Sequence, residues 1–457
     1  MTILNESGVP DVVSPLHGLS GLAEDLKDAL ILVVGTRADA HLAVSLAGPL
    51  PGSPAPGVSP KKPAPSVSFV VLEPGERPEG GVLASRVVEA ASGSRDAGVV
   101  LLVACRSARF LGVDPHFEAE LAERRLGGLP VRAIEAVPAT SGVLSTDLVD
   151  EALRVLVDLS PSGVSGPEHE ESIHAKGGAR AGLLGRLRGR TGGRGSYDEA
   201  SEGKSVVLLG GASRSRGELA SELRRAGVEV GGSVPADERG GLPGGISELP
   251  AVGEGAVVAV LDPYLAGATR EAEERGATVV KTLFPIGVDG TSRFIGDVVA
   301  ATGGVTSGTA RARKIWEGLE HLRSRVRGKR VFFTGDSGLE VPLARFLANA
   351  GAVVLEVGTP RLEKRFLGVE LSALGSDVDV VESPDWRAQL GRIEAARPDV
   401  VVAGPGLFVP LVARGHLCRS SLDLLALDPR GYEGARRVLA LFTRTFERAE
   451  ALDALNL

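Results

Sequence analysis

The stretch KRVFFTGDSGLEVPLARFL, residues 329–347, decides the fold class. Its apolar run at 331–333, after Lys329 and Arg330, is typical of a buried strand, Gly335 then marks a tight turn, and residues 339–350 carry apolar side chains at helical spacing. A second apolar run at 353–357 predicts another strand after that helix. A strand, a glycine turn, a helix and a further strand form a β–α–β unit, which predicts a parallel sheet covered by helices.

The same unit occurs twice before this stretch. The first copy has predicted strands at 29–34, 68–72, 99–104 and 131–134, and predicted helices at 38–46, 82–91 and 147–159. The second copy has predicted strands at 205–209, 256–261 and 277–281, and predicted helices at 216–226, 266–275 and 310–326. The third copy adds a helix at 386–396 and a strand at 400–403. We therefore predict an α/β protein with three Rossmann-like domains, whose parallel sheets surround a central cleft.

The predicted domain boundaries follow changes in composition. Residues 49–65 are rich in proline and predict a loop, and residues 160–203 are rich in glycine and mixed charges, which predicts a disordered linker. We expect these segments in order: an N-terminal segment at 1–27, a first α/β domain at 28–159, the linker at 160–203, a second α/β domain at 204–327, and a third at 328–457 with C-terminal helices.

Composition excludes several classes of protein. A net charge of −7 argues against a general nucleic-acid binder, whose surface is basic. Two cysteines, Cys105 and Cys418, cannot build a disulfide framework and fit a reducing compartment. No apolar run approaches the roughly 18 residues of a membrane span, and the N-terminus lacks the pattern of a signal peptide. We expect a cytoplasmic protein without a membrane span or a nucleic-acid partner.

Three strand-to-glycine turns are candidate anion sites, because backbone N–H groups at a helix start can bind an anion. They are Gly35-Thr36, Gly210-Gly211 and the turn at 335–338. Glu356 follows Gly335 by 21 residues, the spacing of a ribose-binding acid, so one hypothesis is a nucleotide-binding α/β protein. The full G-x-G-x-x-G pattern is absent, and tight turns need glycine whatever they bind, which favours a structural role.

Residues 205–446 resemble the N subunits of light-independent protochlorophyllide reductases, which are relatives of nitrogenase component 1. The most specific match is DSGLEVPLARFL at 336–347. Further matches follow in order: DPYL at 262–265, FPIGVDGT at 284–291, EVGTP at 356–360, RPDV at 397–400 and GYE at 431–433. In the first domain the resemblance rests on Asp28, LVVGT at 32–36, Ala40-His41 and the spacing to Cys105.

This resemblance implies a function in chlorophyll or bacteriochlorophyll biosynthesis. It implies a heterotetramer of N-type and B-type subunits that reduces one ring double bond of protochlorophyllide, a tetrapyrrole. It also implies a separate iron protein that binds and hydrolyses ATP and delivers electrons from ferredoxin. The chain would then be a subunit of a nitrogenase-like oxidoreductase and would not itself bind ATP.

The resemblance further implies a [4Fe-4S] cluster at the subunit interface, held by three cysteines of the N subunit and a carboxylate of its partner. Those cysteine positions fall on Ser14, Asp39 and Cys105. Cys105 is a candidate iron ligand, with Asp39 as an oxygen ligand, but a serine hydroxyl does not ionise near neutral pH. Alternatively, Cys105 is a small buried hydrophobe and Asp39 a solvated carboxylate. Retention of the cluster stays open, and a non-catalytic paralogue that acts as a partner or assembly scaffold is the alternative function.

Overall fold

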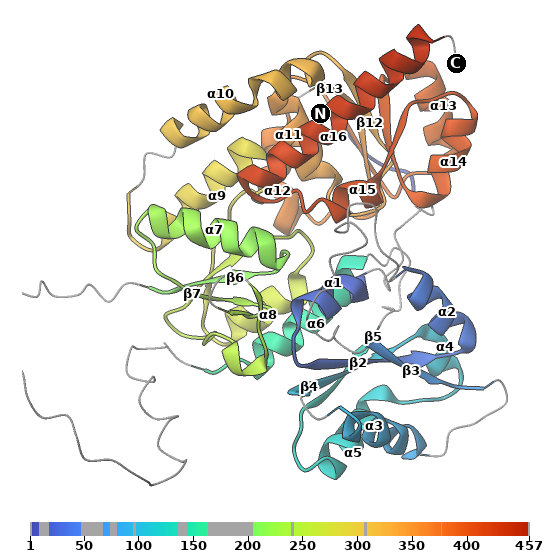
Figure 1. The fold of residues 1–457 in the computed structure, drawn as a ribbon, viewed down its shortest axis with the longest axis vertical. Helices are drawn as coiled ribbons and strands as arrows, with labels where there is room; N and C mark the ends of the chain where they lie inside the picture. Colours follow the sequence, from blue (N-terminus) through green and yellow to red (C-terminus); the bar gives the residue numbers. More distant parts are fainter. Residues whose placement is uncertain are drawn as a thin grey trace, which may run out of the picture.

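The computed structural model describes residues 2–8, 18–46, 67–73, 80–94, 97–135, 145–162, 204–238, 242–305, 309–375 and 377–455. The predicted loop at 49–65, the predicted linker apart from residues 160–162, and Ser14 lie outside these residues. The described chain forms three α/β domains, each built on a sheet of parallel strands, as the sequence predicts (Figure 1).

The first domain has a four-stranded sheet in the order β3-β2-β4-β5. Its strands are β2 (Ala29–Gly35), β3 (Val67–Val71), β4 (Val99–Ala104) and β5 (Val131–Glu135). Its helices are α1 (Gly18–Asp25), α2 (Arg37–Leu46), α3 (Val82–Ser92), α4 (Arg106–Phe110), α5 (Pro115–Arg125) and α6 (Ser145–Leu159). Alternate residues of β2 enter different cores: Ile31 packs with α1 and α6, whereas Leu32 packs with α3 and α5. Both faces are covered, which explains the continuous aliphatic run of this strand.

The second domain has a four-stranded sheet in the order β11-β10-β6-β7. Its strands are β6 (Val206–Leu209), β7 (Val230–Val234), β10 (Val257–Val260) and β11 (Thr278–Val279), and a short hairpin joins β8 (Asp237–Glu238) to β9 (Leu242–Pro243). Its helices are α7 (Ser213–Arg225), a 3₁₀ turn at Ile246–Glu248, α8 (Ala266–Glu274), α9 (Gly287–Ala301) and α10 (Thr309–Val326). Helix α6 of the first domain packs against α8 and so joins the two domains.

The third domain has a six-stranded sheet in the order β1-β14-β13-β12-β15-β16. Its strands are β1 (Thr2–Asn5), β12 (Arg330–Phe333), β13 (Val353–Thr359), β14 (Asp379–Glu382), β15 (Val400–Ala403) and β16 (Cys418–Ser420). Its helices are α11 (Glu340–Ala350), α12 (Lys364–Leu374), α13 (Trp386–Ala396), α14 (Pro405–Ala413), α15 (Ser421–Ala426) and α16 (Gly431–Ala454). The pairing of β1 with β14 has no signal in the local sequence pattern, because this four-residue strand is exposed and its partner lies near the other end of the chain.

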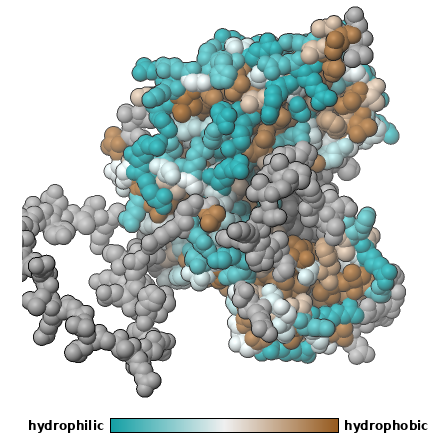
Figure 2. Space-filling view, viewed as in Figure 1, coloured by the Kyte–Doolittle hydropathy of each residue, from teal (hydrophilic) through white to brown (hydrophobic). Residues whose placement is uncertain are grey.

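The helices between the second and third domains form a continuous layer. Helices α9, α10 and α16 pack against one another, and α9 also packs against α11. One apolar core runs from the first sheet through α6 into the second and third domains. On the face shown in Figure 2, polar side chains dominate the upper left, over α7 and α10, whereas apolar side chains gather over the first domain at the lower right.

Candidate functional site

A cavity of about 210 Å³ lies where the three domains meet. The first domain lines it with α1 and α6, the second with the turn after β6, and the third with Leu339 and Arg430. The second and third domains reach it with turns that follow the carboxyl ends of parallel strands, the usual place for ligands in open α/β sheets. This cavity occupies the predicted central cleft.

The wall of the cavity is mostly aliphatic. Its large apolar side chains are Leu22, Val149, Leu153, Leu265, Leu339 and Leu425. Its side chains with polar groups are Asp25, Thr146, Asp262 and Arg430. Apolar walls with a few placed polar groups are typical of small-molecule sites.

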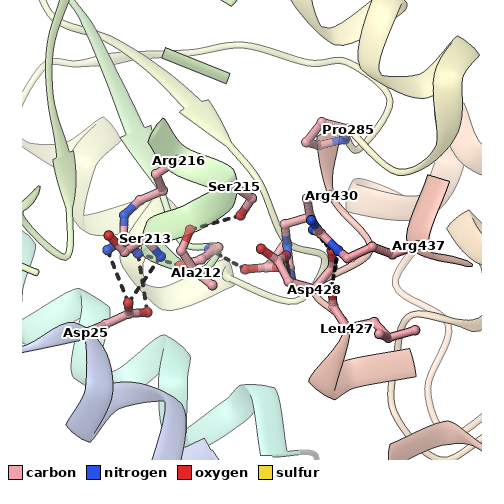
Figure 3. A network of polar contacts seen from close by, with 12 residues as sticks. Asp25, Ala212, Ser213, Ser215, Arg216, Pro285, Leu427, Asp428, Arg430 and Arg437 are labelled. Atoms are coloured by element: carbon pink, nitrogen blue, oxygen red, sulfur yellow. Dashed lines mark hydrogen bonds and ion pairs between the residues drawn. The ribbon is translucent and has the colours of Figure 1, made fainter. Parts of the chain in front are cut away.

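Asp25, at the end of α1, joins the first domain to the second (Figure 3). Its Oδ1 atom accepts a hydrogen bond from the backbone N–H of Ser213 at 3.2 Å and lies 3.4 Å from Nη2 of Arg216. The buried Arg216 guanidinium also binds Asp237, with 2.7 Å between Nη2 and Oδ1. Burial raises the pKa of Asp25, and the opposing effects of Arg216 and the Ser213 N–H do not cancel this rise.

Asp262, just after β10, joins the second domain to the third. Its Oδ2 atom accepts a hydrogen bond from the N–H of Gly211 at 2.7 Å, and its Oδ1 atom accepts one from Nε of Arg430 at 2.7 Å. Arg430 also donates to Oδ1 of Asp428 at 2.8 Å (Figure 3). Burial alone would lower the pKa of Arg430, but these two carboxylates raise it above its usual value, so the guanidinium at the cavity wall stays charged.

In the first two glycine turns that the sequence offers as anion sites, carboxylates of the chain itself accept the backbone N–H groups. Asp39 accepts a hydrogen bond from the N–H of Thr36 at 2.8 Å in the turn after β2. Asp262 accepts the N–H of Gly211 in the turn after β6. Neither turn therefore presents the complete set of free donors that a phosphate would need.

The third turn is closed in the same way. Oε1 of Glu340 accepts hydrogen bonds from the N–H groups of Asp336 at 2.9 Å, Ser337 at 2.5 Å and Gly338 at 3.1 Å. Gly335 has a φ of 86°, and a Cβ there would lie 2.3 Å from the carbonyl carbon of Gly358. Glycine is needed here by the close approach of two backbone segments, not by a ligand.

Glu356 does not lie where a ribose-binding acid is expected. The residue falls in the middle of β13, not at its end, and it is only 4% exposed. Its Oε1 atom is 3.0 Å from Nη2 of Arg392 and 3.3 Å from Nε2 of Gln389. Because its carboxylate is already bound by these partners and the glycine turn is closed, the geometry gives no support to the nucleotide-binding hypothesis.

Two of the three positions that the resemblance assigned to cluster ligands lie at the carboxyl ends of the two central strands of the first sheet. Asp39 is in the first turn of α2, which follows β2, and Cys105 directly follows the neighbouring strand β4. Ser14, the third position, lies outside the described residues. Cys105 is 3% exposed and packs in the apolar core, and burial, aided by the negative charge of Asp39, raises the pKa of its thiol to about 12.

The donors present here do not fit an iron–sulfur cluster. Such a cluster takes several thiolates as ligands, whereas Cys105 is the one cysteine at these three positions and its side chain packs in the apolar core. The Asp39 carboxylate already accepts hydrogen bonds from Thr36 and Ser107. Within the part of the chain that the structure describes, no three His, Cys, Asp or Glu side chains are grouped so that they could hold a metal ion.

Sequence reasoning missed the polar residues that line the cavity. Asp262 and Arg430 lie in or beside stretches that matched the resemblance, DPYL at 262–265 and GYE at 431–433, so a signal was present without a role attached to it. Asp25 had no such signal, because its partners Ser213 and Arg216 belong to another domain.

None of the described helices is both long enough and apolar enough to cross a membrane.

Comparisons with known proteins place the sequence in a family. Residues 171–443 match the family described as nitrogenase component 1 type oxidoreductase. The light-independent protochlorophyllide reductase subunit N of Heliobacterium modesticaldum is 30% identical over 98% of this chain and 97% of that relative. The corresponding subunit of Roseiflexus castenholzii is 40% identical over 257 residues, and this alignment spans 56% of the chain but only 60% of the relative's length.

Solved structures show the same fold. A chain of the structure titled "Nitrogenase Cp1 at pH 6.5" superposes with a TM-score of 0.66, covering 97% of this chain and 93% of that chain, at 14% identity. Because the family match covers more than half of the sequence and a relative 30% identical aligns over nearly all of it, this chain belongs to the nitrogenase component 1 type oxidoreductases.

Proposed function

We propose that this chain is the N-type subunit of a protochlorophyllide-reductase-like complex in the cytoplasm. The observation that carries the proposal is the alignment, over 98% of this chain, with a relative named light-independent protochlorophyllide reductase subunit N. In such a complex a B-type subunit pairs with this chain, and an iron protein uses ATP to pass on electrons that come from ferredoxin. The reaction is the reduction of one ring double bond of a tetrapyrrole.

The central cavity supports a role in binding the tetrapyrrole. Its aliphatic wall suits the apolar face of a macrocycle. A volume of about 210 Å³ is smaller than the roughly 300–1,000 Å³ of ordinary ligand pockets, so the cavity would hold one edge of the macrocycle. The paired charges of Asp262 and Arg430 would face that edge and orient it. A [4Fe-4S] cluster would supply electrons in such a complex, but this chain's described donors do not fit one.

The test is reconstitution of the complete complex. The chain is purified anaerobically with its B-type and iron-protein partners, and the conversion of protochlorophyllide to chlorophyllide is followed by absorbance with ATP and a ferredoxin-level reductant. We expect turnover with the wild-type chain. Replacing Val149 in the cavity wall, Val149→Trp, should lower the rate about tenfold or more, since the bulky ring fills the cavity.

Val409→Trp is the matched control, because Val409 is 68% exposed on α14, away from the cavity lining. This variant should keep wild-type turnover. A complex that assembles and contains every partner but never reduces the tetrapyrrole would contradict the proposal and favour the scaffold alternative. Failure to bind the B-type subunit would contradict both.

A further inference from the structure

At the carboxyl ends of the central strands of the first sheet, where the resemblance implies a cluster, side chains of this chain bind one another. Strands β2 and β4 run side by side, with Val34 opposite Ala104, and α2 and α4 start directly beyond them. These two helix starts bring Asp39 and Ser107 together although 68 residues separate them in the sequence.

Three residues, Thr36, Asp39 and Ser107, form one hydrogen-bonded group, called here the polar seal. Oδ2 of Asp39 accepts hydrogen bonds from the Thr36 N–H at 2.8 Å, from the Thr36 hydroxyl at 2.7 Å and from the Ser107 hydroxyl. The Thr36 N–H also lies 3.2 Å from Oγ of Ser107.

The backbone is shaped to hold this carboxylate. A Cβ at Gly35 would lie 2.7 Å from Oδ2 of Asp39, so only glycine leaves room for the side chain to fold back onto the turn. The Asp39 side chain therefore lies directly against the backbone of this turn.

The cysteine beside the seal faces the core. Cys105 donates its backbone N–H to the carbonyl of Val34 at 2.8 Å, which completes the ladder between β2 and β4. Its side chain packs in the apolar cluster that contains Ile31 and Val103, under the sheet edge.

We infer that the polar seal replaces a metal site: Thr36, Asp39 and Ser107 close the carboxyl edge of the first sheet by hydrogen bonds, and this subunit contributes no ligand from that edge to an iron–sulfur cluster. The proposed function is needed only to name an iron–sulfur cluster as the group that relatives would hold there. The contacts of the seal stand independently of it.

The first test measures iron. The chain, alone and with its B-type partner, is reconstituted anaerobically with ferrous iron and sulfide, and its iron content and reduced-state EPR spectrum are compared with those of Cys105→Ala. We expect the same near-zero iron bound by both forms of the chain alone, and no EPR signal that depends on Cys105 in the complex. A stoichiometric cluster that is lost in Cys105→Ala would overturn the inference. Binding of the B-type subunit is scored separately and tests only the proposed function.

The second test measures stability of the iron-free chain. Asp39→Ala and Ser107→Ala should each lower the melting temperature by about 2 °C or more. The double variant should lose less than the sum of the two, since both substitutions break the same contact. Glu120→Ala, on the exposed face of α5 in the same domain, is the control and should leave the melting temperature unchanged. An iron-free Asp39→Ala chain as stable as the wild type would overturn the seal, because a mere metal ligand stabilises nothing when iron is absent.

The third test measures access to the thiol. In a Cys418→Ser background, Cys105 should react with a thiol reagent only after the chain is unfolded by denaturant. Rapid reaction in the native chain would show an available thiolate and would contradict the inference. Asp39→Ala removes the neighbouring negative charge and opens the turn, so this variant should react measurably faster than its parent.

Discussion

Carboxylate side chains of this protein bind backbone N–H groups at the starts of its helices. Besides the three glycine turns, Glu118 accepts hydrogen bonds from the N–H groups of Gly81 and Ala84 at the start of α3, both at 2.7 Å. Glu218 does the same for Tyr432 at the start of α16, at 2.7 Å. A negative charge at a helix N-terminus is favourable, because the first N–H groups lack helical partners and carry the positive end of the helix dipole. At the helix starts named here, the places where an external anion could bind are therefore taken by the chain's own carboxylates.

Asp150 shows how such a contact depends on pH. Its carboxylate accepts hydrogen bonds from the N–H groups of Gly267 at 2.7 Å and Ala268 at 2.8 Å and so ties α6 to α8. Burial raises its pKa to about 6, against the opposing effect of these two hydrogen bonds. The folded chain therefore binds this proton more tightly than the unfolded chain, and the stability that it contributes is lost as pH rises from about 4 through about 6.

We predict that Asp150→Asn flattens the pH dependence of stability in this window. The change removes a contribution of up to about 3 kcal/mol, as expected for a shift of about two pKa units. The measurement is the free energy of unfolding by urea at several pH values between 4 and 7. Asp158→Asn, at an exposed position of the same helix, should leave the slope in place. Equal slopes in Asp150→Asn and the wild type would show that Asp150 does not titrate in this range.

Among the secondary-structure elements, β1 is the one whose position depends most on distant residues. Its backbone pairs with β14, and Glu6, just after it, is held by Arg392 of α13, with 2.6 Å between Nη1 and Oε1. The same guanidinium binds Glu356 of β13. A single arginine thus joins the first strand to the centre of the third sheet.

We predict that Arg392→Ala destabilises the third domain by about 2–3 kcal/mol, because it leaves the buried Glu356 without its counter-charge. Thermal unfolding followed by circular dichroism measures the loss. Arg387→Ala is the control on the same helix, since the Arg387 guanidinium stacks over the half-exposed Trp386, and it should cost well under 1 kcal/mol. Calorimetric titration of the wild-type chain and of Glu356→Ala with a dinucleotide should give no saturable heat for either. Saturable binding that depends on Glu356 would restore the nucleotide hypothesis.

Across the whole molecule, a buried ion pair connects the second and third domains. Arg345 of α11 and Glu370 of α12 are 1% and 0% exposed at their side chains. Arg345 donates to the carbonyl of Ile286 at 2.8 Å, and Glu370 accepts the N–H of Phe284 at 2.8 Å. Both members of the pair therefore hydrogen-bond the loop that leads into α9. The second domain is attached to the third by these buried polar contacts as well as by surface packing.

We predict that Arg345→Met costs about 3–5 kcal/mol, since it leaves Glu370 buried and unpaired. The double variant Arg345→Met/Glu370→Gln should recover part of this loss, because glutamine is neutral and still accepts the Phe284 N–H. Denaturant unfolding followed by tryptophan fluorescence measures both. A double variant less stable than Arg345→Met would contradict the ion-pair argument.

The domain boundaries lead to another prediction at this scale. The composition of residues 160–203 cannot bury enough apolar surface to offset the entropy of ordering, so limited proteolysis should cut there first. Mass spectrometry of the early fragments locates the cut. Early cleavage within 204–327, with 160–203 left intact, would contradict the predicted boundaries.

Much of the fold follows from the sequence by itself. The buried strands β2, β4 and β6 fall within one residue of the predicted ranges, because a strand covered on both faces must be a continuous aliphatic run. The helices that follow the glycine turns are also predicted, although α7 begins earlier than expected, at Ser213. These features depend on residues that are close together in the sequence, so the local pattern of apolar residues and glycines predicts them.

Only the tertiary structure decided what the polar residues do. The spacing of Glu356 fits a ribose-binding acid, yet Arg392, 36 residues further on, binds it. Asp25 meets Ser213 across 188 residues, and Asp39 meets Ser107 across 68. The chemistry of a carboxylate depends on which donors surround it and on how far water is excluded, and both are set by the packing of distant segments, which no local sequence pattern encodes.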